Sequence, residues 1–302
     1  MNHSRRKFFQ YAGAAAAGAL ILPNWGCKSD GTTNGEAAKE APAVTGSLAQ
    51  YGLQLWSVRD DMAKDPKGTL KQVASFGYKQ IESFEGEKGM YWGMTNKEFK
   101  AYMDELGMTI VSSHCDAKKD LEKKAAEAAE IGIKYLITPH IGAQKTLADW
   151  KPIVESFNKN GEICKKAGIR YAYHNHAYSF QPVDGQLPQD FMLANTDPGL
   201  VDFELDIYWV VTGGKDPIEY LQKYPNRFRL CHVKDRSKAL PATEEDASCV
   251  LGTGSIDFPK VLKIAQDNGM QYFIVEHERW DDSTPLKCAE LDAAYLSKMV
   301  FA

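Results

Sequence analysis

Residues 167–176 read AGIRYAYHNH, and within them a helix ends and a strand begins. Apolar side chains recur at helical intervals over residues 150–167, and Gly168 stands where a left-handed residue caps a helix. Aromatic residues typical of a buried strand follow, and the run closes on two imidazoles. The stretch therefore predicts a helix, a glycine cap and a strand that carries ionisable groups at its end.

The same unit recurs along the chain. Short apolar runs rich in β-branched or aromatic residues occupy residues 51–58, 79–84, 109–114, 135–140, 170–176, 201–209, 228–234 and 272–277. Helical patterns cover residues 67–76, 96–106, 120–131 and 150–167, and glycine precedes the next strand at Gly77, Gly107, Gly132, Gly168 and Gly269. Eight such units in series predict one closed (β/α)₈ TIM barrel over residues 49–302. No G-x-G-x-x-G motif follows the first strand, so nothing in the sequence supports a nicotinamide-binding Rossmann domain.

Composition excludes several other classes of protein. The 302 residues are 44% hydrophobic and 25% charged, as in globular proteins and unlike fibrous or disordered chains. The formal net charge is -4, and the first 27 residues contain three basic side chains and no acidic one. The remaining body is therefore more acidic still, so we expect no nucleic acid partner. The six cysteines form no CxxC pair, and they predict neither a zinc ribbon nor a disulfide scaffold.

The N-terminal segment has the features of an export signal. Arg5 and Arg6 precede two phenylalanines and an alanine-rich apolar run too short to span a bilayer. Residues 1–27 therefore resemble a twin-arginine signal peptide, and Cys27 lies where a bacterial lipoprotein carries its lipid. Residues 28–48 lack an apolar period and predict a flexible tether. We expect a periplasmic protein, or one anchored to the membrane through a lipid on Cys27.

Ionisable residues gather at the predicted strand ends. In a parallel barrel all these ends lie on the face that carries the active site. Six of the seven histidines lie at or near strand ends. His174, Asp206, His232 and Glu276, from four successive strands, form a mixed nitrogen and oxygen set. Such a set predicts one divalent ion, Mn²⁺, Zn²⁺, Co²⁺, Fe²⁺ or Mg²⁺, rather than Ca²⁺. The ion would neutralise two carboxylates that otherwise repel.

Five segments carry a resemblance to a known family: residues 52–59 (GLQLWSVR), 173–176 (YHNH), 205–206 (LD), 232–235 (HVKD) and 275–277 (VEH). They resemble the sugar phosphate isomerase/epimerase family, whose members have a xylose isomerase-like TIM barrel, and the likeness covers residues 49–302. The resemblance implies one divalent metal held by His174, Asp206, His232 and Glu276. The chain departs from the family in having His174 in place of the first glutamate, a change shared by the Tyr-His-Asn-His branch. It also has Trp209 where many relatives have a histidine.

The resemblance also implies a reaction. It predicts a sugar isomerase or epimerase that removes a proton next to a carbonyl and stabilises the enediolate with the metal. Glu276 is then metal ligand and base, and His176 is a second acid or base. Contacts to the sugar or keto-sugar are expected from Trp56, Glu82, His114, Trp209 and Lys234.

Two alternatives remain open, and a third is disfavoured. The same proton removal on a 3-keto-glycoside can expel the aglycone, because replacing the family glutamate by His174 leaves one carboxylate base. The barrel can also belong to a non-catalytic sugar-binding lipoprotein. A metal-dependent endonuclease for abasic DNA shares the ligand layout, but the acidic body and Trp209 disfavour it.

Overall fold

The computed structural model describes residues 46–281 and 283–302. The chain separates into two units, residues 1–42 and 43–302, and only the second is described. The predicted signal peptide, Cys27 and residues 28–45 of the predicted tether lie outside the described residues. Within the described part, no helix has the length and apolar character needed to cross a membrane.

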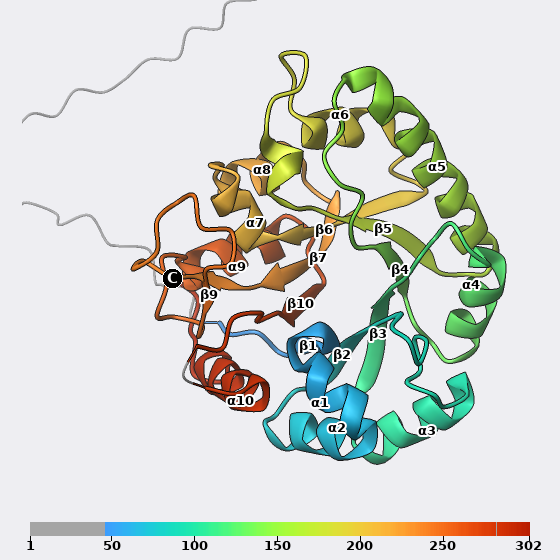
Figure 1. Ribbon diagram of the computed structural model, residues 1–302, viewed down its shortest axis with the longest axis vertical. Coiled ribbons are helices and arrows are strands. Elements are labelled where there is room, and N and C mark those ends of the chain that lie inside the picture. Colours follow the sequence, from blue (N-terminus) through green and yellow to red (C-terminus); the bar gives the residue numbers. More distant parts are fainter. Residues whose placement is uncertain (1–45, 282) are drawn as a thin grey trace, which may run out of the picture. The chain divides into compact units, whose positions relative to one another are not determined.

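Parallel strands close into a barrel that helices surround (Figure 1). Over the described residues, its eight strands are β1 (Gly52–Gln54), β2 (Gln80–Phe84), β3 (Thr109–His114), β4 (Tyr135–Thr138), β5 (Arg170–His174), β6 (Val201–Asp206), β7 (Phe228–Val233) and β10 (Tyr272–Val275). They pair in chain order, and β10 returns to β1. A separate antiparallel pair joins β8 (Asp235–Arg236) to β9 (Ser248–Cys249). The predicted TIM barrel is confirmed.

Helices connect the strands. They are η1 (Leu55–Val58), α1 (Arg59–Lys64), α2 (Pro66–Ser75), α3 (Asn96–Glu105), α4 (Leu121–Glu130), α5 (Leu147–Lys166), η2 (Ala177–Phe180), α6 (Pro188–Asn195), α7 (Ile207–Thr212), α8 (Pro217–Lys223), α9 (Phe258–Asp267) and α10 (Pro285–Leu296), where η1 and η2 are 3₁₀ helices. Capping boxes at Thr95 and Thr146 begin α3 and α5. The five predicted cap glycines all adopt positive φ, from 67° at Gly107 to 104° at Gly77, which confirms their role.

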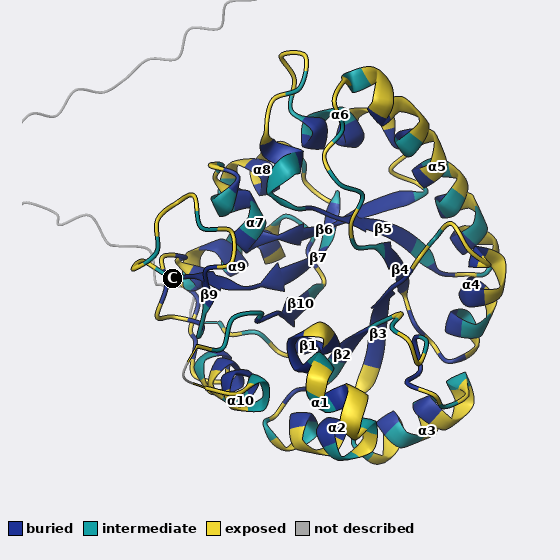
Figure 2. Ribbon diagram, in the orientation of Figure 1, coloured by how far each residue is buried: buried dark blue, intermediate teal, exposed yellow. Residues whose placement is uncertain are grey.

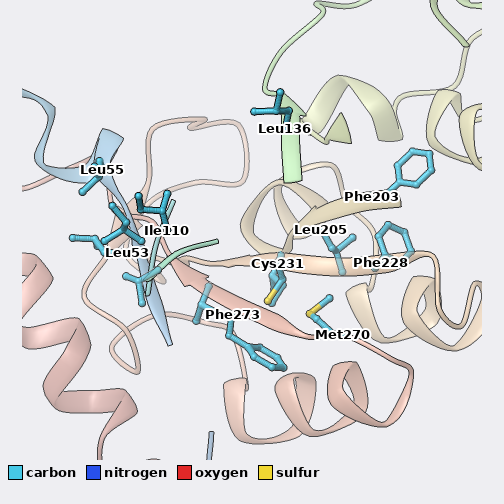
Figure 3. Packing of buried hydrophobic residues seen from close by; sticks show 14 of the residues in the cluster. Leu53, Leu55, Ile110, Leu136, Phe203, Leu205, Phe228, Cys231, Met270 and Phe273 are labelled. Carbon is cyan, nitrogen blue, oxygen red and sulfur yellow. The ribbon is translucent and has the colours of Figure 1, made fainter. Parts of the chain in front are cut away.

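The main core fills the space between the strands and the outer helices, where buried residues line the inner side of each helix (Figure 2). Phe203 and Leu205 of β6 lie close to Phe228 and Cys231 of β7 in this layer (Figure 3). Inside the barrel a smaller apolar cluster contains Tyr135, Ile137, Ala172 and Leu230. Because alternate strand residues share a face, the next interior positions after Ala172 and Leu230 are His174 and His232. The barrel interior therefore changes from apolar to polar toward the strand ends.

Six of the predicted strands end earlier than expected, by one residue at β7 and by two to four residues at the others. The run predicted over residues 201–209 stops at Asp206, because its side chain accepts the Trp209 backbone N–H at 2.9 Å and caps α7. Trp209 is thus helical. The strand predicted over residues 51–58 gives way to η1, and that over residues 170–176 ends at His174. His176 therefore does not share a strand face with His174; it precedes η2.

Candidate functional site

Two irregularities in strand register place buried carboxylates inside the barrel. The pairing of β2 with β3 shifts between Ile81 and Glu82, and that of β6 with β7 shifts between Phe203 and Glu204. An extra residue on one strand re-aims the side chains beside it. Both glutamates are fully buried. Both register shifts therefore lie next to the polar part of the barrel interior, near the strand ends.

Glu82 is held by hydrogen bonds on both oxygens. Gln54 Nε2 donates to Oε1 at 2.6 Å, and Ser112 Oγ donates to Oε2 at 2.6 Å. His114 Nε2 lies 3.1 Å from Glu82 Oε1 and 2.8 Å from Glu204 Oε2. Burial alone would lower the pKa of His114, but Glu82 and Glu204 outweigh it and raise that pKa to about 10. His114 is therefore a cation that joins the two carboxylates.

The two interior histidines of β5 and β7 each contact one of these carboxylates. His174 Nδ1 lies 3.1 Å from Glu204 Oε2, and His232 Nε2 lies 2.7 Å from Glu82 Oε1. Metal-binding histidines generally donate their second ring N–H to a carboxylate in this way, which sets the tautomer and the ring orientation. The contacts leave His174 Nε2 and His232 Nδ1 as the nitrogens available to a metal.

Those two nitrogens meet two carboxylates. His174 Nε2 lies 3.8 Å from Asp206 Oδ2, and His232 Nδ1 lies 3.5 Å from the same oxygen and 3.3 Å from Glu276 Oε2. Among the described residues, neither Asp206 Oδ2 nor His232 Nδ1 has a hydrogen-bond partner, although both are buried. Orphaned buried polar atoms are costly unless a ligand satisfies them. Asp206, His232 and Glu276 place ligand atoms within 4.8 Å of one another and so fit one divalent metal. His174 Nε2 lies beside Asp206, and we call His174, Asp206, His232 and Glu276 the metal set.

Asp206 is positioned from both sides. Its Oδ1 accepts the backbone N–H of Trp209, which leaves Oδ2 turned toward the histidines. The Asn175 side chain also bonds the Asp206 main chain twice, with Nδ2 donating to the carbonyl and Oδ1 accepting the N–H, each at 3.1 Å. A helix cap and an amide bridge between β5 and β6 thus fix this ligand before any metal arrives.

A second group of side chains has ligand atoms close enough together to hold a metal ion. It consists of His114, His174, Glu204 and His232. It would use the inner nitrogens of His174 and His232, which already lie at hydrogen-bond distance from Glu204 and Glu82. A neutral imidazole offers a single lone pair, so each of these rings can ligate through one nitrogen only. The inner carboxylates therefore support the metal set rather than hold a second ion.

The electrostatics of the metal set follow from burial and its neighbours. The pKa of His174 lies well below its ordinary value, because the ring is desolvated and stands near His232. Burial alone would raise the pKa of Glu276, but the charges of Lys234 and His232 hold it well below its usual range. His174 is therefore neutral and Glu276 ionised at neutral pH, as metal binding requires. Burial alone would lower the pKa of His232, but the nearby carboxylates raise it well above its ordinary value, so a metal that binds there must displace a proton from this ring.

Lys234 is buried beside the metal set. Its Nζ donates to Glu276 Oε2 at 3.3 Å and also to Glu278, whose Oε1 accepts the Trp56 indole N–H at 3.1 Å. Burial alone would lower the pKa of Lys234, yet Glu276 and Glu278 raise it above its ordinary value. Lys234 is thus a fixed cation between two carboxylates, and Trp56 closes the rim through Glu278.

Aromatic rings form the wall next to His174. The His176 ring stacks on Trp209 with centroids 5.1 Å apart, and it lies edge-on to His140 at 4.9 Å. Burial, and then the charge of His140, lower the pKa of His176 to about 3. His176 is therefore neutral at physiological pH, and its Nδ1 has no hydrogen-bond partner among the described residues.

A cavity of about 690 Å³ opens over the metal set. Of the residues predicted to act in the site, those that line it are Trp56, His114, His174, His176, Trp209 and Glu276. Asp206, His232 and Lys234 lie beneath this lining, fully buried or nearly so. Glu82 is also buried away from it with both oxygens bonded, so its position suits the support of His232 and not a contact to sugar.

Sequence reasoning assigned no role to Glu204 or to the pairing of Glu278 with Lys234. Glu204 lies two positions before Asp206 on β6, so strand alternation places both on the interior face. That signal was available in the sequence. Contacts between Glu204 and His114 join positions 90 residues apart, and no local pattern indicates them.

Comparisons with known proteins identify the family and several relatives of this chain. A profile of the xylose isomerase-like TIM barrel family matches residues 70–299. An inosose dehydratase from Clostridium perfringens (strain 13) is 32% identical over 144 residues, 43% of this chain and 48% of that protein. Another from Geobacillus kaustophilus is 24% identical over 273 residues, 76% of this chain and 86% of that protein. The chain thus spans about half the length of the first of these relatives.

A solved structure is similar over most of the chain. The crystal structure of a sugar phosphate isomerase/epimerase from Parabacteroides distasonis is 31% identical to this chain. It covers 86% of this chain and 97% of its own, with a TM-score of 0.71. The family match over residues 70–299 includes the four residues of the metal set.

Proposed function

This chain belongs to the xylose isomerase-like TIM barrel family, and from that premise we propose that it removes a proton next to the carbonyl of a keto-sugar and eliminates a leaving group from the adjoining carbon. The observation that carries the proposal is the convergence of Asp206 Oδ2, His232 Nδ1 and Glu276 Oε2, with His174 Nε2 beside Asp206, next to the cavity. These residues would hold one divalent ion, which would supply Lewis acidity toward the substrate carbonyl.

The residues of this chain supply the proton chemistry. Glu276 is ionised, lines the cavity and takes the proton from the carbon next to the carbonyl. The electron pair left behind forms a carbon–carbon double bond as the bond to the leaving-group oxygen on the next carbon breaks. That oxygen then takes up a proton from solvent. Lys234 holds Glu276 in place, and neutral His176 offers a hydrogen bond to a substrate hydroxyl rather than a proton.

Isomerisation or epimerisation is the second candidate. It is supported by the 31% identical isomerase/epimerase structure, which this chain matches over 86% of its length. Epimerisation needs a second group to return the proton from the opposite face. Among the described residues, the carboxylates that line the cavity next to the metal set are Glu276 and Glu278, which leave the same strand end. The inosose dehydratase relatives also favour elimination, since a dehydratase removes water.

The test uses the metal-loaded protein and 4-nitrophenyl 3-keto-β-D-glucoside. Elimination releases 4-nitrophenol and leaves an unsaturated keto-sugar, whereas isomerisation leaves the glycosidic bond intact. We expect release of 4-nitrophenol, and a loss of at least ~100-fold in kcat for Glu276→Gln at saturating metal. Full activity after exhaustive chelation, or no turnover of any keto-sugar, would contradict the proposal.

We also propose that the enzyme works outside the cytoplasm, attached to the membrane through Cys27. The support is the Arg5-Arg6 pair, the apolar run after it and the position of Cys27. Cell fractionation of the full chain tests this: Arg5→Lys with Arg6→Lys should retain the protein in the cytoplasm, and Cys27→Ser should release it from the membrane fraction.

A further inference from the structure

The cavity is larger than the metal set requires. Its volume is about 690 Å³, within the range of ~300–1,000 Å³ in which proteins enclose drug-sized ligands. The part of the cavity over the metal set is lined by the predicted site residues Trp56, His114, His174, His176, Trp209 and Glu276. The remaining volume extends toward the loops after β3 and β4 and toward α5. A substrate that fills it carries a second moiety beside the sugar ring.

The chemistry of the lining changes along the cavity. The far part is lined by Cys115, Thr138, Ile141, Ile153, Phe157 and Tyr171, and we call it the distal arm. These side chains are apolar or aromatic except for Thr138, whose hydroxyl accepts the Tyr171 O–H at 2.7 Å, and the polar Ser156 and Asn160 of α5 line the cavity beside them. By contrast, the part over the metal set is lined by histidines and carboxylates.

The distal arm lies outside the barrel wall. Tyr171 alternates on β5 with Ala172, which faces the barrel interior, and its ring lies 5.7 Å from that of Phe157 on α5. Ile153 and Phe157 are four residues apart on α5 and so lie on one face of that helix. The distal arm thus ends against the packed contact between the outer face of β5 and α5.

Building on the proposed function, we infer that the substrate is a keto-sugar glycoside whose aglycone is apolar and aromatic and binds in the distal arm. Ile141 and Ile153 are half-buried and offer such a group apolar contact, while the Phe157 and Tyr171 rings are buried in the core behind them. A phosphate would need a cluster of basic side chains. Among the described residues that line the cavity, Lys118 is the one lysine or arginine, and it is exposed. A free sugar would leave the arm without a ligand group.

The test measures binding, so it does not depend on turnover. Methyl β-D-glucoside and 4-nitrophenyl β-D-glucoside lack the keto group and do not eliminate, and calorimetry gives the Kd of each for the metal-loaded protein. We expect the aryl glucoside to bind at least tenfold tighter. Ile153→Trp fills the arm and should remove that preference, while the matched variant Lys159→Trp, on the exposed face of α5, should keep it. If Ile153→Trp does not fold, Ser156→Trp on the exposed rim of the arm replaces it.

The outcomes separate the two proposals. Equal affinity for the two glucosides, no measurable binding of the aryl glucoside at millimolar concentration, or a preference that survives both arm-filling variants would overturn the inference. If the protein prefers the aryl glucoside but turns over no 3-keto-glycoside, the distal arm is supported and the proposed reaction is contradicted. If the protein turns over methyl and aryl 3-keto-glucosides with equal Kd and kcat/KM, the proposed reaction is supported and the role of the distal arm is contradicted.

Discussion

His232 Nε2 lies 2.7 Å from Glu82 Oε1, and the two residues stand 150 positions apart in the chain. The contact turns the opposite nitrogen of the ring, Nδ1, toward Asp206 and Glu276. One buried carboxylate on β2 thus determines which nitrogen of a β7 histidine is available to a metal. The pair of His174 with Glu204 repeats the arrangement between β5 and β6.

Asp206→Asn should abolish metal binding, because it removes the negative charge at an oxygen that has no other partner among the described residues. We expect affinity for Zn²⁺ or Mn²⁺ to fall by at least ~100-fold. Metal content after dialysis, measured by elemental analysis, checks this. Asp104→Asn on the surface of α3 is the control and should keep full metal content. Stoichiometric metal in Asp206→Asn would remove Asp206 from the metal set.

Glu204→Gln tests the support of the metal set without touching a ligand. The amide cannot replace the carboxylate that orients His174 and balances His114, so metal affinity should fall by ~10–100-fold. Activity should return when metal is raised to saturation. Titration of activity against free metal measures both effects. Activity that stays low at every metal concentration would place Glu204 in the reaction itself.

His277 should stabilise the fold in a pH-dependent way. Its Nδ1 lies 2.9 Å from Asp292 Oδ2 on α10 and its Nε2 lies 2.8 Å from the Arg279 carbonyl, so both nitrogens carry protons. Burial alone would lower the pKa of His277, but the bond with Asp292 outweighs it and raises the pKa to about 10. A raised pKa gives stability that is complete below about pH 6.5 and is lost as the pH rises through about 10.

His277→Gln checks this on the metal-free protein. The variant should lower the free energy of unfolding by about 1.5–3 kcal/mol at pH 6 and by progressively less toward pH 10, as urea titration would show. His140→Gln, at an exposed ring, should change stability by less than ~0.5 kcal/mol. A difference between wild type and His277→Gln that grows with pH would reverse the assigned sign.

The cap glycines should respond unequally to alanine. Gly168 has φ of 84° and no atom within 4 Å of an added Cβ, so Gly168→Ala should cost only the left-handed strain, ~1–2 kcal/mol. Gly269 has φ of 94°, and its Cβ would lie 2.3 Å from Asn226 Oδ1, so Gly269→Ala should cost more. Thermal unfolding of both variants measures the order. Equal stability of the two variants would show that the Asn226 side chain moves away from the added methyl group with no loss of stability.

Much of the site could be predicted from the sequence because strand ends are local features. The predicted runs over residues 170–176 and 228–234 are apolar segments that close on ionisable residues, and the barrel topology brings such ends to one face. The predicted end of the strand over residues 201–209 was wrong because a side chain there bonds to the backbone and begins a helix. Asp206 ends β6 by capping α7, and a strand pattern that continues apolar to Trp209 does not reveal that cap.

The sequence by itself determined the eight strand–helix units, the glycine caps between them and the ionisable residues at the strand ends. Alternation, helical period and capping depend on neighbours a few residues apart, so a linear pattern suffices to indicate them. Only the tertiary structure decided that Glu82 and Glu204 orient the metal set, and that the cavity continues outside the barrel toward α5. Those relationships join residues far apart in the chain and depend on register shifts and closure of the barrel, which no local pattern encodes.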